Sequence, residues 1–214
     1  MLRLYNFQDS GNSYKQRLLL TQLGREFERI DIDLVGGETQ TARYRDRNPL
    51  GQTPFIELED GRTLAESNAI LWHLAEGTRY FPEGSWTRAQ ALQWMSFEQY
   101  RIEPTIGTVR YWTQLLKVAD QRRELVTQKL GIAQAALGIL DRHLATHSFV
   151  VGERYGIADI SLYAYGHLAE EAGVSLTPYP ALVRWLERVK AQPKHIAITA
   201  EVGHVIPWPK ARTS

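Results

Sequence analysis

The sequence contains no cysteine, and this absence excludes several kinds of chemistry. Without cysteine there is no disulfide framework, no zinc–thiolate site and no catalysis by a protein thiol. Any thiol that reacts in this protein must therefore be brought by a ligand. A chain of 214 residues can bury a large core, so neither a disulfide nor a metal is needed to hold it together.

The sequence also lacks blocks of positive charge and long hydrophobic runs. Lysine and arginine never exceed two in succession, and the formal net charge is +1. We therefore expect neither a nucleic-acid partner nor a polybasic membrane anchor. No apolar stretch approaches the ~20 residues that span a bilayer, and no signal peptide is visible. A cytoplasmic location is the default expectation.

The first part of the chain alternates between strand-like and helix-like patterns. Strands are predicted at residues 2–7, 27–34, 54–58 and 63–65, and helices at 13–24, 39–47 and 66–75. The first two strands are joined by a helix and so run parallel, whereas the last two form a hairpin. This β-α-β-α-β-β-α order is that of the thioredoxin-like fold, and it predicts an α/β domain at residues 1–78.

The pattern changes after an irregular linker at residues 77–86. Amphipathic helices are predicted at residues 87–116, 120–145, 157–172 and 180–192. Past residue 86 we expect no strand apart from a short extended segment at residues 149–151. The second domain, residues 87–214, is therefore expected to be all-helical.

A polar turn, Ser10-Gly11-Asn12-Ser13, precedes the first predicted helix. The amino end of a helix carries unpaired N–H groups and the positive end of the helix dipole, so a thiol placed there becomes more acidic. Ser13 with Gln16 fits a capping box, which leaves Ser10 and Asn12 as candidate donors to a sulfur atom. By themselves, these two side chains are more typical of an ordinary turn.

The segment Gln52-Thr53-Pro54 stands directly before a predicted strand. A cis peptide between Thr53 and Pro54 would turn the backbone N–H and C=O of Thr53 outward, where an extended peptide could pair with them. Taken alone, the segment also fits an ordinary trans proline.

Glu66 and Ser67 stand at the start of the third predicted helix. The helix amino end, with the N–H and hydroxyl of Ser67, would hold a carboxylate, and Glu66 would hold an ammonium group. Together they suit the α-amino-acid end of a γ-glutamyl residue. The alternative is helix capping, because Thr63 and Glu66 have the spacing of a capping box.

In combination these motifs resemble the soluble glutathione transferases over nearly the whole chain. Residues 48–54 look like the family's segment before its cis-proline, residues 66–70 like its γ-glutamyl motif, and residues 152–160 like its folding motif in the helical domain. The family usually has serine or threonine at the helix cap of that last motif. This chain has Gly156, so Asp159 must supply more of the cap.

The resemblance implies an enzyme that takes glutathione as co-substrate, uses no metal, and conjugates the thiolate to a small apolar electrophile bound between the domains. The turn resembles both a serine (zeta- or theta-like) pattern and a bacterial threonine/asparagine (nu-like) pattern, so Ser10 is the first candidate to stabilise the thiolate and Asn12 the second. The glutathione-binding residues would be Gln40, Gln52, Thr53, Pro54, Glu66 and Ser67. The electrophile pocket would include Ile106, Arg110 and Tyr111. The family forms homodimers, and we expect that contact on the helix from Thr87.

Two other functions stay open at this point. One is a glutathione-dependent disulfide reductase or isomerase on the same scaffold, which would still use Ser10 and Asn12. The other is a non-catalytic relative that uses the fold for protein contacts, as some translation and transcription factors do. The intact polar turn and the pair Glu66-Ser67 favour an enzyme, because a binding module would not need them.

Overall fold

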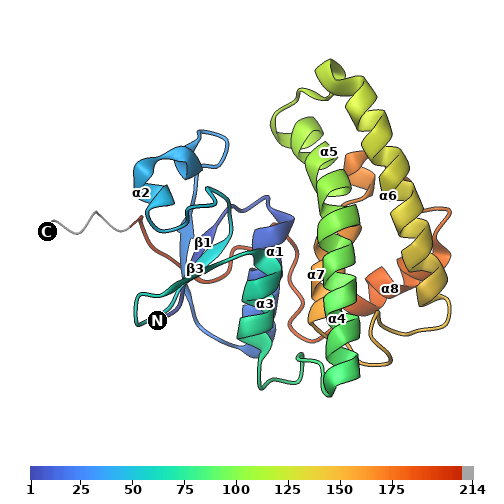
Figure 1. Cartoon of the computed structure of the whole chain (residues 1–214), viewed down its shortest axis with the longest axis horizontal. Coiled ribbons are helices and arrows are strands. Elements are labelled where there is room, and N and C mark those ends of the chain that lie inside the picture. Colours follow the sequence, from blue (N-terminus) through green and yellow to red (C-terminus); the bar gives the residue numbers. More distant parts are fainter. Residues whose placement is uncertain (209–214) are drawn as a thin grey trace, which may run out of the picture. The chain divides into compact units, whose positions relative to one another are not determined.

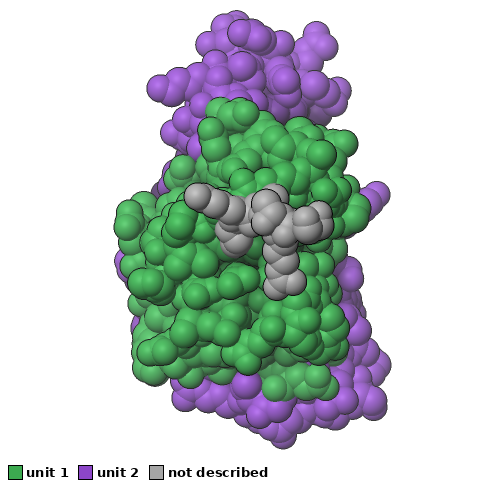
Figure 2. All heavy atoms as spheres, turned by 90° about the vertical axis from the view of Figure 1, so that its left-hand side faces the viewer, with its two compact units in different colours: residues 1–76, 193–214 green, residues 77–192 purple. Residues whose placement is uncertain are grey.

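The computed structural model describes residues 1–208, which form two compact units (Figure 2). The first unit combines residues 1–76 with the end of the chain from residue 193, and the second unit is residues 77–192. The helical part therefore ends earlier than the sequence suggested, because residues 193–208 belong with the first unit.

A five-stranded mixed sheet forms the centre of the first unit (Figure 1). Its strands are β1 (Arg3–Asn6), β2 (Glu28–Asp31), β3 (Phe55–Glu57), β4 (Thr63–Ala65) and β5 (His204–Val205), in the spatial order β4-β3-β1-β2-β5. β1 pairs in parallel with β2 and antiparallel with β3, and β3 and β4 form the predicted hairpin. The predicted thioredoxin-like order is confirmed.

Helices complete the first unit. They are α1 (Gly11–Leu23), α2 (Ala42–Arg45), α3 (Ser67–Ala75) and the short 3₁₀ helix η1 (Glu38–Gln40). α1 and α3 pack against each other (Figure 1). Successive residues of β1 face opposite sides of the sheet, so Leu4 and Tyr5, both fully buried, contribute to different halves of the core. Tyr5 joins a cluster with residues from β2, β3 and α2.

The fifth strand, β5, was not predicted, and the expectation of no strand past residue 86 is wrong. β5 pairs in parallel with β2, with His204 opposite Glu28 and Val205 opposite Arg29. A two-residue strand is too short to show an alternating pattern, and only its pairing with β2 makes it a strand. Just before it, Gly203 has φ 82°, and a Cβ there would lie 2.5 Å from the Phe27 ring.

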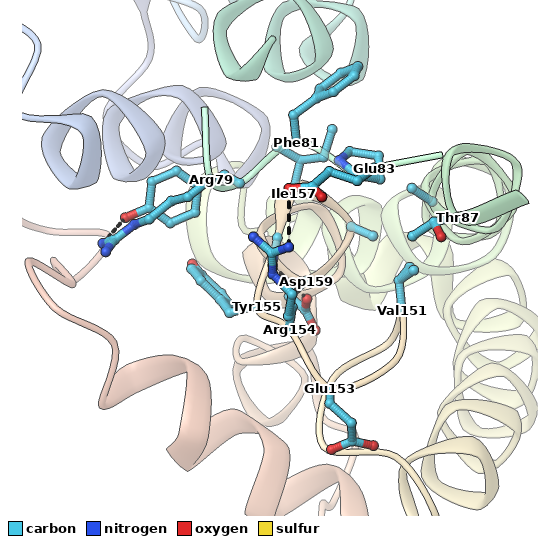
Figure 3. A pocket seen from close by; sticks show the side chains of 15 residues that line it. Arg79, Phe81, Glu83, Thr87, Val151, Glu153, Arg154, Tyr155, Ile157 and Asp159 are labelled. Atoms are coloured by element: carbon cyan, nitrogen blue, oxygen red, sulfur yellow. Dashed lines mark hydrogen bonds and ion pairs between the residues drawn. The ribbon is translucent and has the colours of Figure 1, made fainter. Parts of the chain in front are cut away.

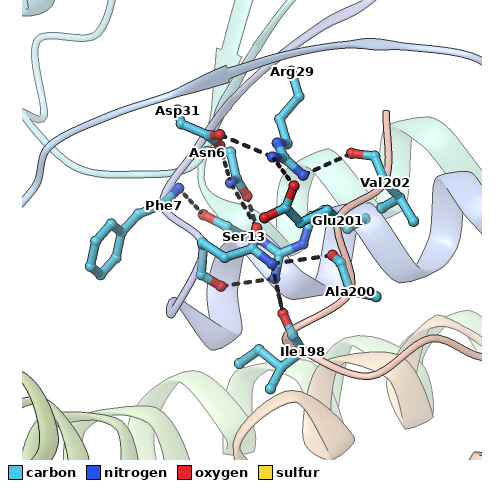
Figure 4. Close-up of polar contacts among 11 residues, drawn as sticks. Asn6, Phe7, Ser13, Arg29, Asp31, Ile198, Ala200, Glu201 and Val202 are labelled. Atoms are coloured by element: carbon cyan, nitrogen blue, oxygen red, sulfur yellow. Dashed lines mark hydrogen bonds and ion pairs between the residues drawn. The ribbon is translucent and has the colours of Figure 1, made fainter. Parts of the chain in front are cut away.

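Figure 4 shows Ile198, Ala200 and Val202 of this returning segment near Asn6 and Arg29 of the sheet. A buried arginine on α1, Arg17, anchors the segment. Arg17 is fully buried, and its guanidinium donates to the carbonyls of Gln8 at 2.9 Å and Ile198 at 2.8 Å, and to the Asn6 side chain. Burial, followed by the nearby Arg29 charge, lowers the pKa of Arg17 to about 10, so it still carries its charge at neutral pH.

The second unit is all-helical, as predicted. Its helices are α4 (Ser85–Phe97), the π-helical η2 (Glu98–Gly107), α5 (Thr108–Arg110), the π-helical η3 (Tyr111–Leu115), the 3₁₀ helix η4 (Ala119–Arg122), α6 (Arg123–Leu144), α7 (Ile157–Gly166), the 3₁₀ helix η5 (Glu170–Ala172) and α8 (Pro180–Lys190). Pro104 lies inside η2 and cannot donate a helix hydrogen bond, which fits the wider turns there. Every residue of α7 is buried, so α7 is the core of this unit.

No helix among residues 1–208 has both the length and the apolar character needed to cross a membrane. In the same part of the chain, no group of three or more His, Asp or Glu side chains is placed to hold a metal ion.

Candidate functional site

The polar turn forms the start of α1, with Ser10 as the residue that caps the helix. Ser10 Oγ accepts a hydrogen bond from the Ser13 N–H at 3.2 Å. Ser13, which the sequence assigned to capping, is instead fully buried and accepts from the Phe7 N–H at 3.2 Å. That capping prediction is wrong, because the helix begins at Gly11 rather than after Ser13. Ser10 is partly exposed, and its hydroxyl can still donate to a ligand at the helix amino end.

Asn12 lies against the start of α3. The Ser67 hydroxyl donates to Asn12 Oδ1 at 3.1 Å. Gln16 links the same two residues, because its amide nitrogen lies 3.1 Å from the Asn12 carbonyl and 3.0 Å from the Ser67 carbonyl. The structure thus brings the predicted thiol-stabilising turn directly against the predicted carboxylate site.

A buried lysine lies beneath this contact. Lys15 is fully buried, and its ammonium group donates to Ser67 Oγ at 3.2 Å and to Asn68 Oδ1 at 3.3 Å. Sequence reasoning missed Lys15 and Gln16, because polar residues inside a helix are normally expected on its solvent face. Their positions three and four residues after Asn12, on the same face of α1, were the available signal.

Glu66 has a backbone conformation that side chains rarely adopt. Its φ is 66° and its ψ is 109°, and it stands immediately before the first residue of α3. The alternative of a capping box between Thr63 and Glu66 is wrong. Thr63 lies in β4, and the Glu66 side chain makes no capping hydrogen bond to α3. Glu66 is exposed, whereas Ser67 is 5% exposed. A backbone conformation with positive φ costs a residue other than glycine about 1–3 kcal/mol, and such residues cluster at ligand sites. Glu66 is therefore a candidate for ligand binding.

The loop before β3 contains the predicted cis peptide. The Thr53–Pro54 bond is cis, as the sequence suggested. The carbonyl just before it, Gln52 O, accepts hydrogen bonds from the Tyr44 hydroxyl at 2.6 Å and from the Asn48 amide at 2.7 Å. Burial raises the pKa of Tyr44, which keeps its hydroxyl protonated and able to donate. Thr53 itself is partly exposed, and the Gln52 side chain is exposed.

Gln40 lies next to this loop. Its amide nitrogen donates to the Gly51 carbonyl at 3.4 Å, and its amide oxygen accepts from Arg45. Gln40 is exposed, like Gln52. Four of the six predicted glutathione-binding residues, Gln40, Gln52, Thr53 and Glu66, are therefore at least partly exposed, whereas Pro54 and Ser67 are buried.

The three predicted electrophile-pocket residues lie on consecutive helical segments of the second unit. Ile106, in η2, is fully buried. Arg110, in α5, is 8% exposed and forms an ion pair with Glu171 at 2.6 Å. Tyr111 begins η3 and is partly exposed. Tyr111 is thus the most accessible of the three.

Asp159 does carry the cap of α7, as predicted. The Gly156 N–H donates to Asp159 Oδ2 at 3.0 Å, while Asp159 Oδ1 accepts from the Val150 N–H at 3.0 Å and from the Trp185 indole at 2.8 Å. Burial raises the pKa of Asp159 to about 6 in spite of these bonds. A Cβ on Gly156 would lie 3.0 Å from the Tyr80 carbonyl, which explains why glycine suits this cap.

A cavity of about 210 Å³ lies beside this cap, within the second unit (Figure 3). It is lined by the linker residues 79–83 and by residues 151 and 153–159, together with Thr87 and Ala91 of α4. Arg154 and Glu83, both exposed, form an ion pair at 3.2 Å. The linker, the folding motif and α4 together form the lining of this cavity. No residue predicted for the glutathione site or the electrophile pocket lines it.

Comparisons with known proteins agree with the fold. Residues 1–76 match the glutathione S-transferase N-terminal domain and residues 99–193 match the glutathione S-transferase C-terminal domain. A glutathione S-transferase from Pseudomonas fluorescens Pf-5 is 40% identical with a TM-score of 0.91, over 93% of this chain and 99% of that chain. A glutathione transferase family member from Pseudomonas fluorescens pf-5, solved with two glutathione bound, is 25% identical with a TM-score of 0.77, over 90% of this chain and 89% of that chain.

Curated relatives have different activities. Disulfide-bond oxidoreductase YfcG of Escherichia coli is 28% identical over 204 residues, which are 90% of this chain and 92% of that protein. Elongation factor 1-gamma of Carassius auratus is 28% identical over 93% of this chain, but the match spans only 46% of the elongation factor. The chain thus covers about half the length of the elongation factors that it matches. From the two domain matches and the 40% identity over nearly a whole solved relative, the chain belongs to the glutathione S-transferase family.

Proposed function

We propose that the protein binds glutathione in its first unit and joins the glutathione thiolate, through its sulfur, to a small apolar electrophile. The observation that carries this proposal is the 3.1 Å hydrogen bond between Ser67 Oγ and Asn12 Oδ1, which joins positions 55 residues apart in the sequence. A γ-glutamyl group held at Ser67 would place the neighbouring cysteinyl thiol near the polar turn. The glutathione bound to a relative that is 25% identical supports the ligand.

Each end of glutathione has a complementary group in this proposal. The amino end of α3, including the Ser67 N–H, receives the γ-glutamyl carboxylate, and Glu66 receives the α-ammonium group. The backbone N–H and C=O of Thr53, before Pro54, pair with the cysteinyl residue as a short added strand. The side chains of Gln52 and Gln40 reach the glycyl end.

The chemistry is nucleophilic substitution or addition by sulfur. The amino end of α1, with Ser10 or Asn12 as hydrogen-bond donor, stabilises the thiolate, and the thiol proton leaves to solvent. A sulfur electron pair then forms the new C–S bond. When the electrophile is an aryl chloride, the C–Cl bond breaks and chloride departs with its electron pair. Ile106, Arg110 and Tyr111 are proposed to contact this second substrate.

We also propose that the protein is a homodimer and works in the cytoplasm. Trp86 at 75% exposure and Leu92 at 50% lie on α4, and Tyr100 at 73% lies on η2. Large exposed apolar and aromatic side chains near one another in sequence are typical of protein interfaces. The cytoplasm is proposed because its reducing poise keeps glutathione in the thiol form that the reaction consumes.

A second candidate is a glutathione-dependent disulfide reductase. YfcG, a disulfide-bond oxidoreductase, matches this chain over 90% of its length, and Asn12 occupies the polar turn. In this reaction one glutathione thiolate attacks a disulfide sulfur and releases a thiolate. A second glutathione then attacks the mixed disulfide, which yields glutathione disulfide and the second reduced thiol. A non-catalytic binding role is the third candidate, because the elongation factor 1-gamma relatives match at similar identity.

One set of assays separates these candidates. The purified protein is tested for retention on immobilised glutathione and elution by free glutathione, and its affinity is measured by calorimetry. Turnover is then followed with an activated aryl chloride and, separately, with a small organic disulfide coupled to glutathione reductase. Faster turnover of the aryl chloride supports the transferase, and faster turnover of the disulfide supports the reductase. Retention without either turnover would support a binding role, and failure to bind glutathione would refute the proposal.

A further inference from the structure

Lys15 is a buried cation that the proposed function leaves without a role. Its side chain is fully buried, and the ammonium group contacts Ser67 Oγ at 3.2 Å and Asn68 Oδ1 at 3.3 Å. Burying a lysine ammonium is costly unless hydrogen bonds and charges compensate. The position of this charge, directly behind the residue proposed to bind a carboxylate, calls for a physical explanation.

The ammonium group of Lys15 favours one direction for the neighbouring bonds. A hydroxyl oxygen can accept two bonds, but a positive charge beside it makes Ser67 a better donor and disfavours a second N–H at the same oxygen. An ammonium group has donors and no acceptor, so Ser67 Oγ must accept from Lys15. The single hydroxyl proton of Ser67 is then donated to Asn12 Oδ1, at 3.1 Å. The Asn12 amide oxygen therefore faces Ser67, and the amide nitrogen, which carries two N–H donors, is directed away from that hydroxyl.

Without the lysine, the same contact could run in the other direction. The Ser67 oxygen could accept from the Asn12 amide nitrogen, and the amide would then turn its oxygen towards the polar turn. A carbonyl oxygen facing a thiolate is repelled, whereas an N–H facing a thiolate stabilises the charge. The direction of the hydrogen bonds between Lys15, Ser67 and Asn12 thus decides whether Asn12 helps or opposes ionisation of a bound thiol.

We infer, on the basis of the proposed function, that Lys15 is a positioning residue which orients Asn12 through Ser67, so that the Asn12 amide is the main side-chain donor to the glutathione sulfur. Ser10 is the weaker candidate because its oxygen accepts the helix-capping bond from the Ser13 N–H, while its O–H bond can rotate. The Ser67 hydroxyl serves this orientation, and the Ser67 N–H is left to receive the γ-glutamyl carboxylate.

The same arrangement couples the two ends of the proposed site. The positive charge of Lys15 is one hydrogen bond from Ser67 and two from Asn12. A carboxylate bound at the amino end of α3 would therefore be attracted by the charge that also fixes the Asn12 amide. Glutathione analogues without the γ-glutamyl carboxylate should therefore bind more weakly.

The test is a double-mutant cycle on the pKa of the bound thiol. Lys15→Met keeps the length of the side chain without its donors, and Asn12→Ala removes the amide. Glutathione is bound at saturation to the wild type, each single variant and the double variant, and thiolate ultraviolet absorbance is recorded against pH. Lys129→Met, which removes a lysine that donates to the Pro104 carbonyl, is the matched control.

If Lys15 acts through Asn12, each single variant raises the bound thiol pKa by about one unit, which lowers the thiolate fraction below the pKa roughly tenfold. The double variant then shows the same shift as Asn12→Ala alone, because the second change has nothing further to remove. Lys129→Met leaves the pKa of the thiol where it is in the wild type.

Additive shifts would overturn the inference, because they would mean that Lys15 acts by its charge alone. A folded Lys15→Met variant with an unchanged thiol pKa would overturn it as well. If Lys15→Met does not fold, Ser67→Ala replaces it, because Ser67 is the residue that links Lys15 to Asn12. The shifts of the thiol pKa caused by Ser67→Ala and Asn12→Ala must then also be non-additive. A wild type that does not bind glutathione would refute the proposed function itself, whereas a wild type that binds with unaffected variants would refute only the role of Lys15.

Discussion

Replacing Asp159 with alanine should destabilise the protein in a way that depends on pH. Three donors point at this fully buried carboxylate, namely the Val150 N–H, the Gly156 N–H and the Trp185 indole. Alanine would leave all three without their acceptor. Each buried donor left unsatisfied costs about 1–3 kcal/mol, so the loss is about 6 kcal/mol in the middle of that range.

An opposing effect comes from the charge of Asp159. Burial raises its pKa from 3.8 to about 6, so ionising it in the folded protein costs about 3 kcal/mol relative to the unfolded chain. Alanine removes that cost. At pH 7 and above, where wild-type Asp159 is ionised, the net loss of stability should therefore be about 3 kcal/mol.

The sign of the pH dependence follows from the direction of the pKa change. A group with a raised folded pKa contributes stability that is fully present below its unfolded value and is lost as the pH rises through its folded value. Wild-type stability from Asp159 is therefore greatest near pH 4 and declines through about pH 6. The gap between wild type and Asp159→Ala should widen on acidification towards about 6 kcal/mol.

Chemical denaturation at several pH values between 5 and 8, followed by circular dichroism, measures this gap. Asp159→Asn is the matched control: it keeps one acceptor oxygen and carries no charge, so at pH 7 it should be closer to the wild type. Glutathione affinity, measured by calorimetry on the folded variants, should not change. A gap that narrows on acidification, or an alanine variant as stable as the wild type, would refute the reasoning.

Three further predictions concern single positions in the first unit. Glu66→Gly should relieve the strain at φ 66° and raise stability by up to about 1 kcal/mol, yet weaken glutathione binding roughly tenfold by removing the ammonium partner, as unfolding and calorimetry would reveal. Gly203→Ala should lower stability by about 1–3 kcal/mol because its Cβ meets an aromatic ring at 2.5 Å, whereas Gly61→Ala, with a similar φ of 85° and no described atom within 4 Å, should cost less in the same melting experiment. Arg17→Leu should remove one of the two hydrogen bonds to the Ile198 carbonyl and leave only the one from Gln8, and so speed proteolysis after residue 192; equal cleavage rates would contradict that anchoring role.

The order of strands and helices could be predicted because each long element has its own hydrophobic period and its own turn residues. The hairpin β3–β4 is an example, since the turn residues 59–62 separate two short apolar runs. β5 could not be predicted in this way. Its two residues are both exposed, and their extended state depends on the free edge of β2, which no local pattern records.

Within the candidate site, sequence spacing assigned one helix cap to the wrong residue. Ser13 and Gln16 have the spacing of a capping box, in which the Gln16 side-chain oxygen would accept from the Ser13 N–H. Instead, the Ser13 N–H donates to Ser10 Oγ, and the Gln16 amide nitrogen donates to the Asn12 and Ser67 carbonyls. The Gln16 side chain, which local spacing assigns to the helix cap, thus contacts α3 instead. Lys15 was missed for a related reason: a buried lysine is favourable only where another element supplies acceptors, here Ser67 and Asn68 of α3.

Residues 198–200 are remote in sequence from the polar turn, but they help to hold the segment that leads into it. The Gln8 side chain donates to the Ile198 and Ala200 carbonyls, each at 3.1 Å, and Arg17 joins the Gln8 and Ile198 carbonyls through one guanidinium nitrogen. Preorganised donors stabilise charge without reorganising at the moment of reaction. A thiolate at the start of α1 would therefore depend on residues 198–200 for the rigidity of the turn, although none of them needs to touch glutathione.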